Sequence, residues 1–156
     1  MHDISRRDAI RLFSLSAAIG VWSAATTHAE STPLVVYKDP DCGCCEKWVA
    51  HMKATGFAPT VTNTRDIASI KRQHHVPDVL ASCHTALVGG YVVEGHVPAA
   101  DVKRLLAQKP KGVVGLTIPG MPSSAPGMDM TPFKPYTVLA FDAQGKTTVF
   151  AEHKNG

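Results

Sequence analysis

Three of the four cysteines fall within four residues, between an expected strand and an expected helix. The segment Cys42 to Cys45 follows Leu34 to Lys38, a β-branched and aromatic run typical of a buried strand. It leads into apolar side chains at helical spacing, which continue to Thr55 and end at Gly56. At a helix N-terminus, free backbone N–H groups and the helix dipole favour thiolates. Thiolates attack disulfides and bind soft metals, so this segment predicts either redox thiol chemistry or copper-type metal binding.

Residues 1–29 have the features of an export signal. Arg6 and Arg7 precede an uncharged segment from Leu12 to Ala25, which is shorter than the ~20 residues that a transmembrane helix needs. We expect a signal peptide of twin-arginine type, cleaved after Ala25 or Ala29, with an uncleaved N-terminal anchor as the alternative. Export would place the protein in the oxidising bacterial periplasm, where thiols are disulfide-bonded or held by metal.

Removal of residues 1–29 leaves 127 residues, which is a length for one domain with one core. We place this domain at residues 33–152. The 13 basic and 11 acidic residues of the 127-residue chain are closely balanced and form no basic run, so nucleic acid is not an expected partner. No further apolar run is long enough to span a membrane.

The pattern along the domain predicts an α/β fold of thioredoxin-like type. After the first strand and helix, we expect a strand over 59–63, a helix over 66–75, a hairpin of strands over 85–88 and 91–94, and a helix over 98–108. This β-α-β-α-β-β-α order, with Cys-x-x-Cys at the start of the first helix, is the thioredoxin-like plan. Residues 111–135 are rich in proline and glycine and predict a long loop. A C-terminal β-hairpin over 137–141 and 147–150 follows.

A second group of ligand-type side chains, Cys83 and His84, directly precedes the third expected strand. In a thioredoxin-like fold, this junction faces the N-terminus of the first helix. We therefore expect four thiols and one imidazole to converge, which is the inventory of a metal site. The expected donors at this point are Cys42, Cys44, Cys45, Cys83 and His84.

Three of the five methionines, Met121, Met128 and Met130, lie within the proline- and glycine-rich loop. Thioethers are soft neutral ligands, and together with thiolates they select Cu(I). The alternative is that these methionines pack the loop onto the domain as flexible gap-fillers. The remaining histidines after residue 29 are not included in the expected site; they are His51, His74, His75, His96 and His153.

Taken together, these motifs resemble the CopG-like family of exported, thioredoxin-like proteins found with bacterial copper-resistance systems. The matching segments are Tyr37 to Cys45, Ser82 to Thr85, Gly95 to Ala99, Pro119 to Pro122 and Pro126 to Met128. The resemblance implies several copper ions in a cysteine-rich cluster and a proposed interconversion of Cu(I) and Cu(II). It implies that the four cysteines are the cluster thiolates, with His84 and loop methionines as accessory ligands.

We therefore expect a periplasmic protein of copper homeostasis and resistance that holds more than one Cu(I) ion in a multinuclear site. Its expected partners are copper ions and other periplasmic copper-resistance proteins. Interconversion of Cu(I) and Cu(II) would make it a copper oxidoreductase. The alternatives are a thiol–disulfide oxidoreductase that uses Cys42 and Cys45, and a copper chaperone without catalysis.

Overall fold

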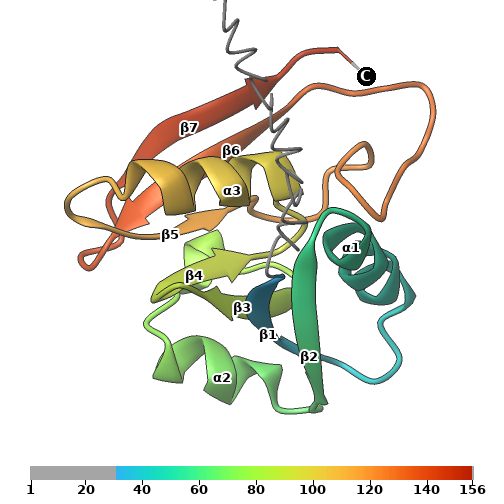
Figure 1. The fold of residues 1–156 in the computed structure, drawn as a ribbon, viewed down its shortest axis with the longest axis horizontal. Helices are drawn as coiled ribbons and strands as arrows, with labels where there is room; N and C mark the ends of the chain where they lie inside the picture. The colour runs from blue at the N-terminus through green and yellow to red at the C-terminus, as the bar shows by residue number, and fades with distance from the viewer. Residues whose placement is uncertain (1–30, 156) are drawn as a thin grey trace, which may run out of the picture.

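The computed structural model describes residues 31–155, so the expected export signal lies outside the described residues. Seven strands form one mixed sheet in the order β2-β1-β3-β4-β5-β6-β7 (Figure 1). The strands are β1 (Thr32–Lys38), β2 (Phe57–Asn63), β3 (His84–Val88), β4 (Tyr91–Glu94), β5 (Val113–Thr117), β6 (Tyr136–Asp142) and β7 (Thr147–His153).

Three α-helices and one 3-10 helix connect these strands. They are α1 (Gly43–Ala54), α2 (Ile67–Gln73), α3 (Ala99–Gln108) and the 3-10 helix η1 (Asp78–Leu80). The order β1-α1-β2-α2-β3-β4-α3 follows the expected order, with η1 inserted before β3. Among the described residues, no helix has the length and apolar character needed to cross a membrane.

The sheet combines parallel and antiparallel pairs. Strand β1 is parallel to β2 and antiparallel to β3, and β3 and β4 form the expected hairpin around Gly89 and Gly90. Both turn glycines have positive φ, the backbone region that two-residue hairpin turns require. Lys38 at the end of β1 lies opposite His84 at the start of β3. This pairing brings the segment before β3 to the end of β1 and to the α1 turn that follows it.

The expectation that residues 111–135 form one long loop is wrong at its start, because β5 occupies part of this range. β5 is parallel to β4 and antiparallel to β6, so it joins the C-terminal hairpin to the rest of the sheet. Glycine usually weakens a strand, which hid β5 in the sequence pattern. A Cβ at Gly115 would lie 2.4 Å from the carbonyl oxygen of Val92, so this close approach requires glycine.

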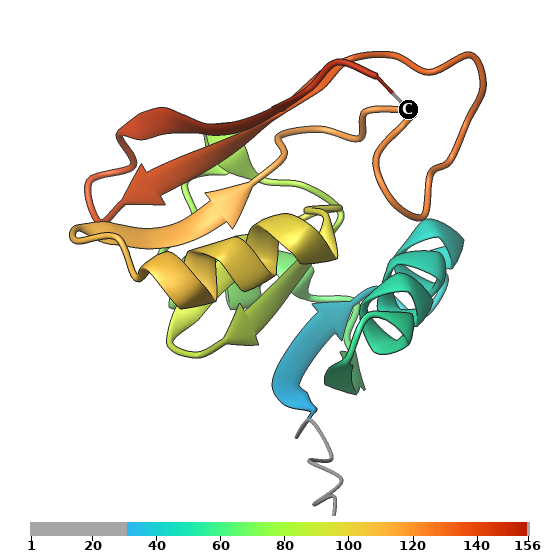
Figure 2. The ribbon, with the colours of Figure 1, turned by 45° about the horizontal axis from the view of Figure 1, so that its top comes forward.

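Apolar cores cover both faces of the sheet, because successive side chains of a strand point to opposite faces. Val93 of β4 faces the larger core, which α1 and α3 cover. Its neighbour Val92 faces the smaller core, which contains Val76, Leu80 and Phe141. α1 and α3 therefore lie on the same face of the sheet, as Figures 1 and 2 show.

Asp101 of α3 holds the C-terminal hairpin against the helix. Its side chain is buried and accepts hydrogen bonds from His153 Nε2 at 2.7 Å and Arg104 Nη2 at 3.0 Å. Arg104 also donates to the carbonyl oxygen of Phe150 at 2.9 Å. The ring of His153 stacks on Tyr136 with centroids 4.7 Å apart. α3 is thus bound directly to β7, and the stacked rings join β7 to β6.

Asp101→Ala should lower the free energy of unfolding by about 1–3 kcal/mol, because it leaves two donors without their acceptor. Urea denaturation measures this change. Glu152→Ala in the same hairpin is the matched control, since it removes only the exposed ion pair with Lys154. The control should change stability less, because water screens an exposed pair. Equal losses in the two variants would contradict the structural role of Asp101.

Candidate metal centre

The cysteine segment lies at the N-terminus of α1, as expected. Cys42 is the N-cap residue, and Cys44 and Cys45 belong to the first turn. Cys45 is fully buried, whereas Cys42 and Cys44 are half-buried. Cys42 and Cys44 are therefore the cysteines of this segment that remain partly accessible to solvent.

A buried lysine fixes the turn that carries these cysteines. Lys38 is fully buried, and its Nζ pairs with Glu46 Oε1 at 2.7 Å and donates to the Asp39 carbonyl oxygen at 3.0 Å. The Asp39 carbonyl also accepts from Cys42 N at 3.1 Å. The end of β1 and the first turn of α1 are thus held together. A buried ammonium needs such partners, because an unpaired one is strongly disfavoured.

Cys83 faces this turn, which confirms the expected placement. The four cysteine sulfur atoms all lie within 4.8 Å of one another. Cys42 and Cys45 are joined by a disulfide, and Cys44 and Cys83 are free thiols. The Cys44 sulfur lies 3.6 Å from that of Cys42. The structure therefore shows the four-sulfur group with one of its pairs oxidised.

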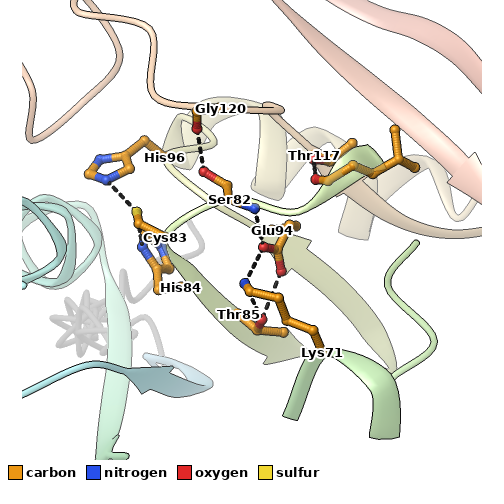
Figure 3. Close-up of polar contacts among 10 residues, drawn as sticks. Lys71, Ser82, Cys83, His84, Thr85, Glu94, His96, Thr117 and Gly120 are labelled. Atoms are coloured by element: carbon orange, nitrogen blue, oxygen red, sulfur yellow. Dashed lines mark hydrogen bonds and ion pairs between the residues drawn. The ribbon is translucent and has the colours of Figure 1, made fainter. Parts of the chain in front are cut away.

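A second imidazole, that of His96, lies beside the group, although the expected site did not include it. Donor atoms of Cys45, Cys83, His84 and His96 lie within 4.8 Å of one another. Figure 3 shows Cys83 between the two histidines, with its sulfur 3.0 Å from His96 Nε2. The sequence of the β3–β4 hairpin already predicted this contact through its register. A two-residue turn that pairs residue 85 with residue 94 places position 83 across from position 96.

His96 is held in the orientation of a metal ligand. Its Nδ1 lies 2.6 Å from the carbonyl oxygen of Pro126, and a carbonyl oxygen can only accept. The ring proton therefore sits on Nδ1, and the Nε2 lone pair faces Cys83. Burial lowers the pKa of His96, which favours the neutral ring, although Pro126 and Asp129 act in the opposite direction. Metal-binding histidines commonly use their second nitrogen in this way.

His84 is fully buried beside Trp48 and His96, with ring centroids 4.3 Å and 5.1 Å away. Its Nδ1 lies 3.3 Å from the Cys83 sulfur. Burial lowers the pKa of His84 well below its usual value, and the nearby His96, Lys71 and Lys38 charges act in the same direction. In the described part of the chain, His84 Nε2 is the buried side-chain polar atom without a hydrogen-bond partner. The His84 ring thus has Nδ1 beside the Cys83 sulfur and an unsatisfied Nε2, and such a buried imidazole fits a metal site.

The surroundings of Cys83 disfavour its thiolate when no metal is bound. Burial raises the pKa of Cys83 to about 12, and the neighbouring Cys44 adds to this shift. A metal ion that binds here must displace the proton, so metal binding would release protons.

A buried polar network lies behind Cys83 and His84 (Figure 3). The Glu94 carboxylate is fully buried and accepts from Ser82 N at 2.6 Å, from Thr85 Oγ1 at 2.7 Å and from the Lys71 ammonium. Burial raises the pKa of Glu94, and the Lys71 charge partly offsets this effect. Ser82 and Thr85 flank the two site residues, so the network fixes the backbone from which Cys83 and His84 project.

The loop between β5 and β6 reaches α1 (Figures 1 and 2). A Cβ at Gly127 would lie 2.8 Å from Trp48 N and 2.9 Å from the Cys44 carbonyl oxygen, so the loop contacts the first turn of the helix. Met128 follows and is half-buried. Met121 and Met130 are 58% and 57% exposed. The structure thus brings the loop to the cysteine group but leaves these two methionine side chains largely in solvent.

The donor atoms favour a soft metal. Among the described residues, both candidate groups contain only cysteine and histidine, without a carboxylate. Thiolate and neutral imidazole suit copper, zinc and related ions, whereas magnesium and calcium require oxygen donors. The site can also form and break a disulfide, because its sulfur atoms are neighbours.

Comparisons with known proteins agree with this chemistry. A family model described as a protein of unknown function, DUF411, matches residues 80–128. No curated protein matches the chain. Two solved structures named copper resistance protein CopG, Form 1 and Form 2, are each 38% identical to this chain. The first match covers 81% of this chain and 100% of the other chain with a TM-score of 0.75, and the second covers 80% and 99% with 0.74. Since the relatives match over essentially their full length at this identity, the chain belongs to the CopG family of copper resistance proteins.

Proposed function

We propose that this chain is an exported copper-binding protein of copper homeostasis and resistance, which holds Cu(I) in a multinuclear site. The observation that carries the proposal is the convergence of four cysteine sulfurs, all within 4.8 Å of one another, with two buried imidazoles at their edge. The names of the solved relatives support copper as the metal. The proposed ligands are Cys42, Cys44, Cys45, Cys83, His84 and His96, with Met121, Met128 and Met130 as accessory donors.

The number of donors supports more than one copper ion. Four sulfurs and two imidazoles exceed the four donors of a tetrahedral site. Thiolates that bridge neighbouring ions would use this surplus. All four sulfurs become available only after the Cys42–Cys45 disulfide is reduced, because the thiolate is the form that binds metal.

The proposal also includes a thioredoxin-like fold and a location in the periplasm. The strand order β2-β1-β3-β4, with the cysteine turn at the N-terminus of α1, supports a thioredoxin-like unit to which β5, β6 and β7 are added. The arginine pair and apolar segment within residues 1–29 support export to the periplasm. Other periplasmic copper-resistance proteins are then the proposed partners.

A second candidate function is thiol–disulfide exchange on protein substrates, which the Cys42–Cys45 disulfide favours. The two functions differ in their need for metal. A disulfide oxidoreductase should reduce insulin disulfides without copper, whereas the copper protein should bind copper after reduction of its own disulfide.

Anaerobic titration of the reduced protein should reach saturation at more than one Cu(I) per chain. Cys83→Ser should weaken binding by about tenfold or more, corresponding to ~1.4 kcal/mol, and as much as Cys44→Ser does. Competition with a Cu(I) chelator measures both quantities. Saturation at one ion or none, or unchanged copper binding by Cys83→Ser, would contradict the shared site.

The loop methionines can be tested by replacing Met121, Met128 and Met130 together with leucine. Such swaps retain apolar volume and usually cost less than ~1.5 kcal/mol of stability. If thioethers bind copper, the variant should lose Cu(I) affinity while its disulfide chemistry, which depends on thiols, is unchanged. If its copper affinity equals that of the parent protein, the methionines only pack the loop.

Gly127→Ala should move the loop off the first turn of α1, because the added methyl group would meet backbone atoms at 2.8 and 2.9 Å. We expect loss of Cu(I) to a chelator to accelerate, since the Pro126 carbonyl that orients His96 would move as well. Gly120→Ala is the matched control: it also has positive φ, but its Cβ would meet open space. Equal rates for the two variants would show that loop contact does not affect the site.

A further inference from the structure

The buried ammonium group of Lys38 is paired with a carboxylate that lies largely in solvent. Lys38 is fully buried, whereas the side chain of its partner Glu46 is 59% exposed. The other buried lysine of the described residues, Lys71, is paired with the fully buried Glu94. Water screens an exposed charge far more than a buried one. Lys38 therefore leaves a net positive charge beside the candidate metal centre.

We propose that the Lys38 charge stabilises the partly loaded states of the copper site, so that the protein takes up and gives up Cu(I) one ion at a time. The inference rests on the proposed copper site and concerns how that site fills. A Cu(I) ion held by two thiolates carries a net negative charge, whereas a cluster with as many Cu(I) ions as thiolates is neutral. Free thiols are also mostly neutral at neutral pH. A nearby cation therefore favours the intermediate states over the empty and the full site.

Backbone contacts place the Lys38 ammonium at the cysteine turn. The Asp39 carbonyl oxygen accepts from Lys38 Nζ at 3.0 Å and from Cys42 N at 3.1 Å, so the ammonium and the N-cap cysteine share one acceptor. Glu46, whose Oε1 lies 2.7 Å from Lys38 Nζ, directly follows Cys45 in the sequence. The charge thus lies against the turn that carries the sulfur atoms.

The Lys38 charge also reaches the second segment of the site. Lys38 lies opposite His84 in the register of β1 and β3. Burial lowers the pKa of His84, and the charges of His96, Lys71 and Lys38 act in the same direction. His84 Nδ1 lies 3.3 Å from the Cys83 sulfur, so a charge that acts on this ring also acts on a metal–thiolate group beside it.

The donors of the site make its charge depend on its copper content. Among the described residues, the candidate donor groups consist of cysteine and histidine, so thiolates supply the negative charge of a loaded site. Neutral imidazoles add none. Each further Cu(I) ion cancels one thiolate charge, and the attraction to Lys38 weakens as the site fills. The chain would therefore act as a graded store of Cu(I) instead of filling and emptying in a single step.

The experiment titrates the reduced protein with Cu(I) under anaerobic conditions. Native mass spectrometry counts the ions per chain, and competition with Cu(I) chelators gives the stepwise affinities. Lys38→Gln removes the charge but retains an N–H donor for the Asp39 carbonyl. We expect the first Cu(I) to bind about tenfold more weakly, whereas the overall affinity of the full site stays within about threefold of the parent value. At low copper, metal-free and fully loaded chains should replace the partly loaded chains of the parent protein.

Glu46→Gln is the matched control, because it breaks the same ion pair but removes the opposite charge. Its first Cu(I) should bind at least as tightly as in the parent protein. If Lys38 only held the turn, both variants would weaken copper binding, and at every step. Glu46 is exposed, so its variant should fold and test the inference even if Lys38→Gln does not fold.

Three outcomes would overturn the inference. They are an unchanged stepwise profile in Lys38→Gln, equal weakening of all its steps, and weaker binding of the first Cu(I) by Glu46→Gln. The parent protein tests the proposed copper site separately. If it binds Cu(I) and Lys38→Gln has the same profile, only this inference fails, whereas a parent protein that binds no Cu(I) removes the proposed function as well.

Discussion

The register of the β3–β4 hairpin is the constraint on which the candidate site depends. The turn at Gly89 and Gly90 pairs Thr85 with Glu94, and the same register places Cys83 near His96 beyond the strand ends. A shift of one residue would turn every side chain of a strand to the opposite face. His84 would then leave the face of the sheet that α1 covers, and Glu94 would lose the hydrogen bond that it accepts from the Ser82 backbone N–H. The short turn therefore determines which donors meet the cysteines of α1.

Two charged pairs near the site stabilise the chain segments that the β3–β4 register brings together. Lys71 and Glu94 form a buried ion pair, and Lys38 pairs with Glu46 at the first turn of α1. Buried ion pairs contribute little net stability, but breaking one leaves an unpaired charge and is costly. The Lys71–Glu94 pair is therefore best understood as fixing the geometry of the segment before β3, whereas the buried Lys38 ammonium, paired with the exposed Glu46, holds the turn before α1. Together they align the two segments that supply the sulfur atoms.

Most of the first half of the fold could be predicted, because its strands and helices have clear periodicity and their ends carry glycine or proline. The convergence of Cys83 with the cysteine turn followed from the expected strand order. β5 was missed because Gly115 weakens the strand pattern, and its need for glycine arises from contacts with strands distant in sequence. His96 was left out because its motif was considered alone, although the hairpin register already related it to Cys83. The disulfide pairing could not be chosen, since the spacing of the cysteines allows more than one connection.

The hydrogen bond from His96 Nδ1 to the Pro126 carbonyl connects the loop between β5 and β6 with an imidazole of the site. A bound metal at Nε2 would polarise the ring and strengthen the Nδ1–H donor, so metal occupancy would favour the docked loop. Thermodynamic linkage makes this coupling reciprocal: whatever draws the loop away from α1 must weaken metal binding by the same factor. A receiving protein that captures the loop would thereby lower the affinity of the site at the moment of contact. Copper would then be released when a recipient protein binds the loop and retained when no such protein is present.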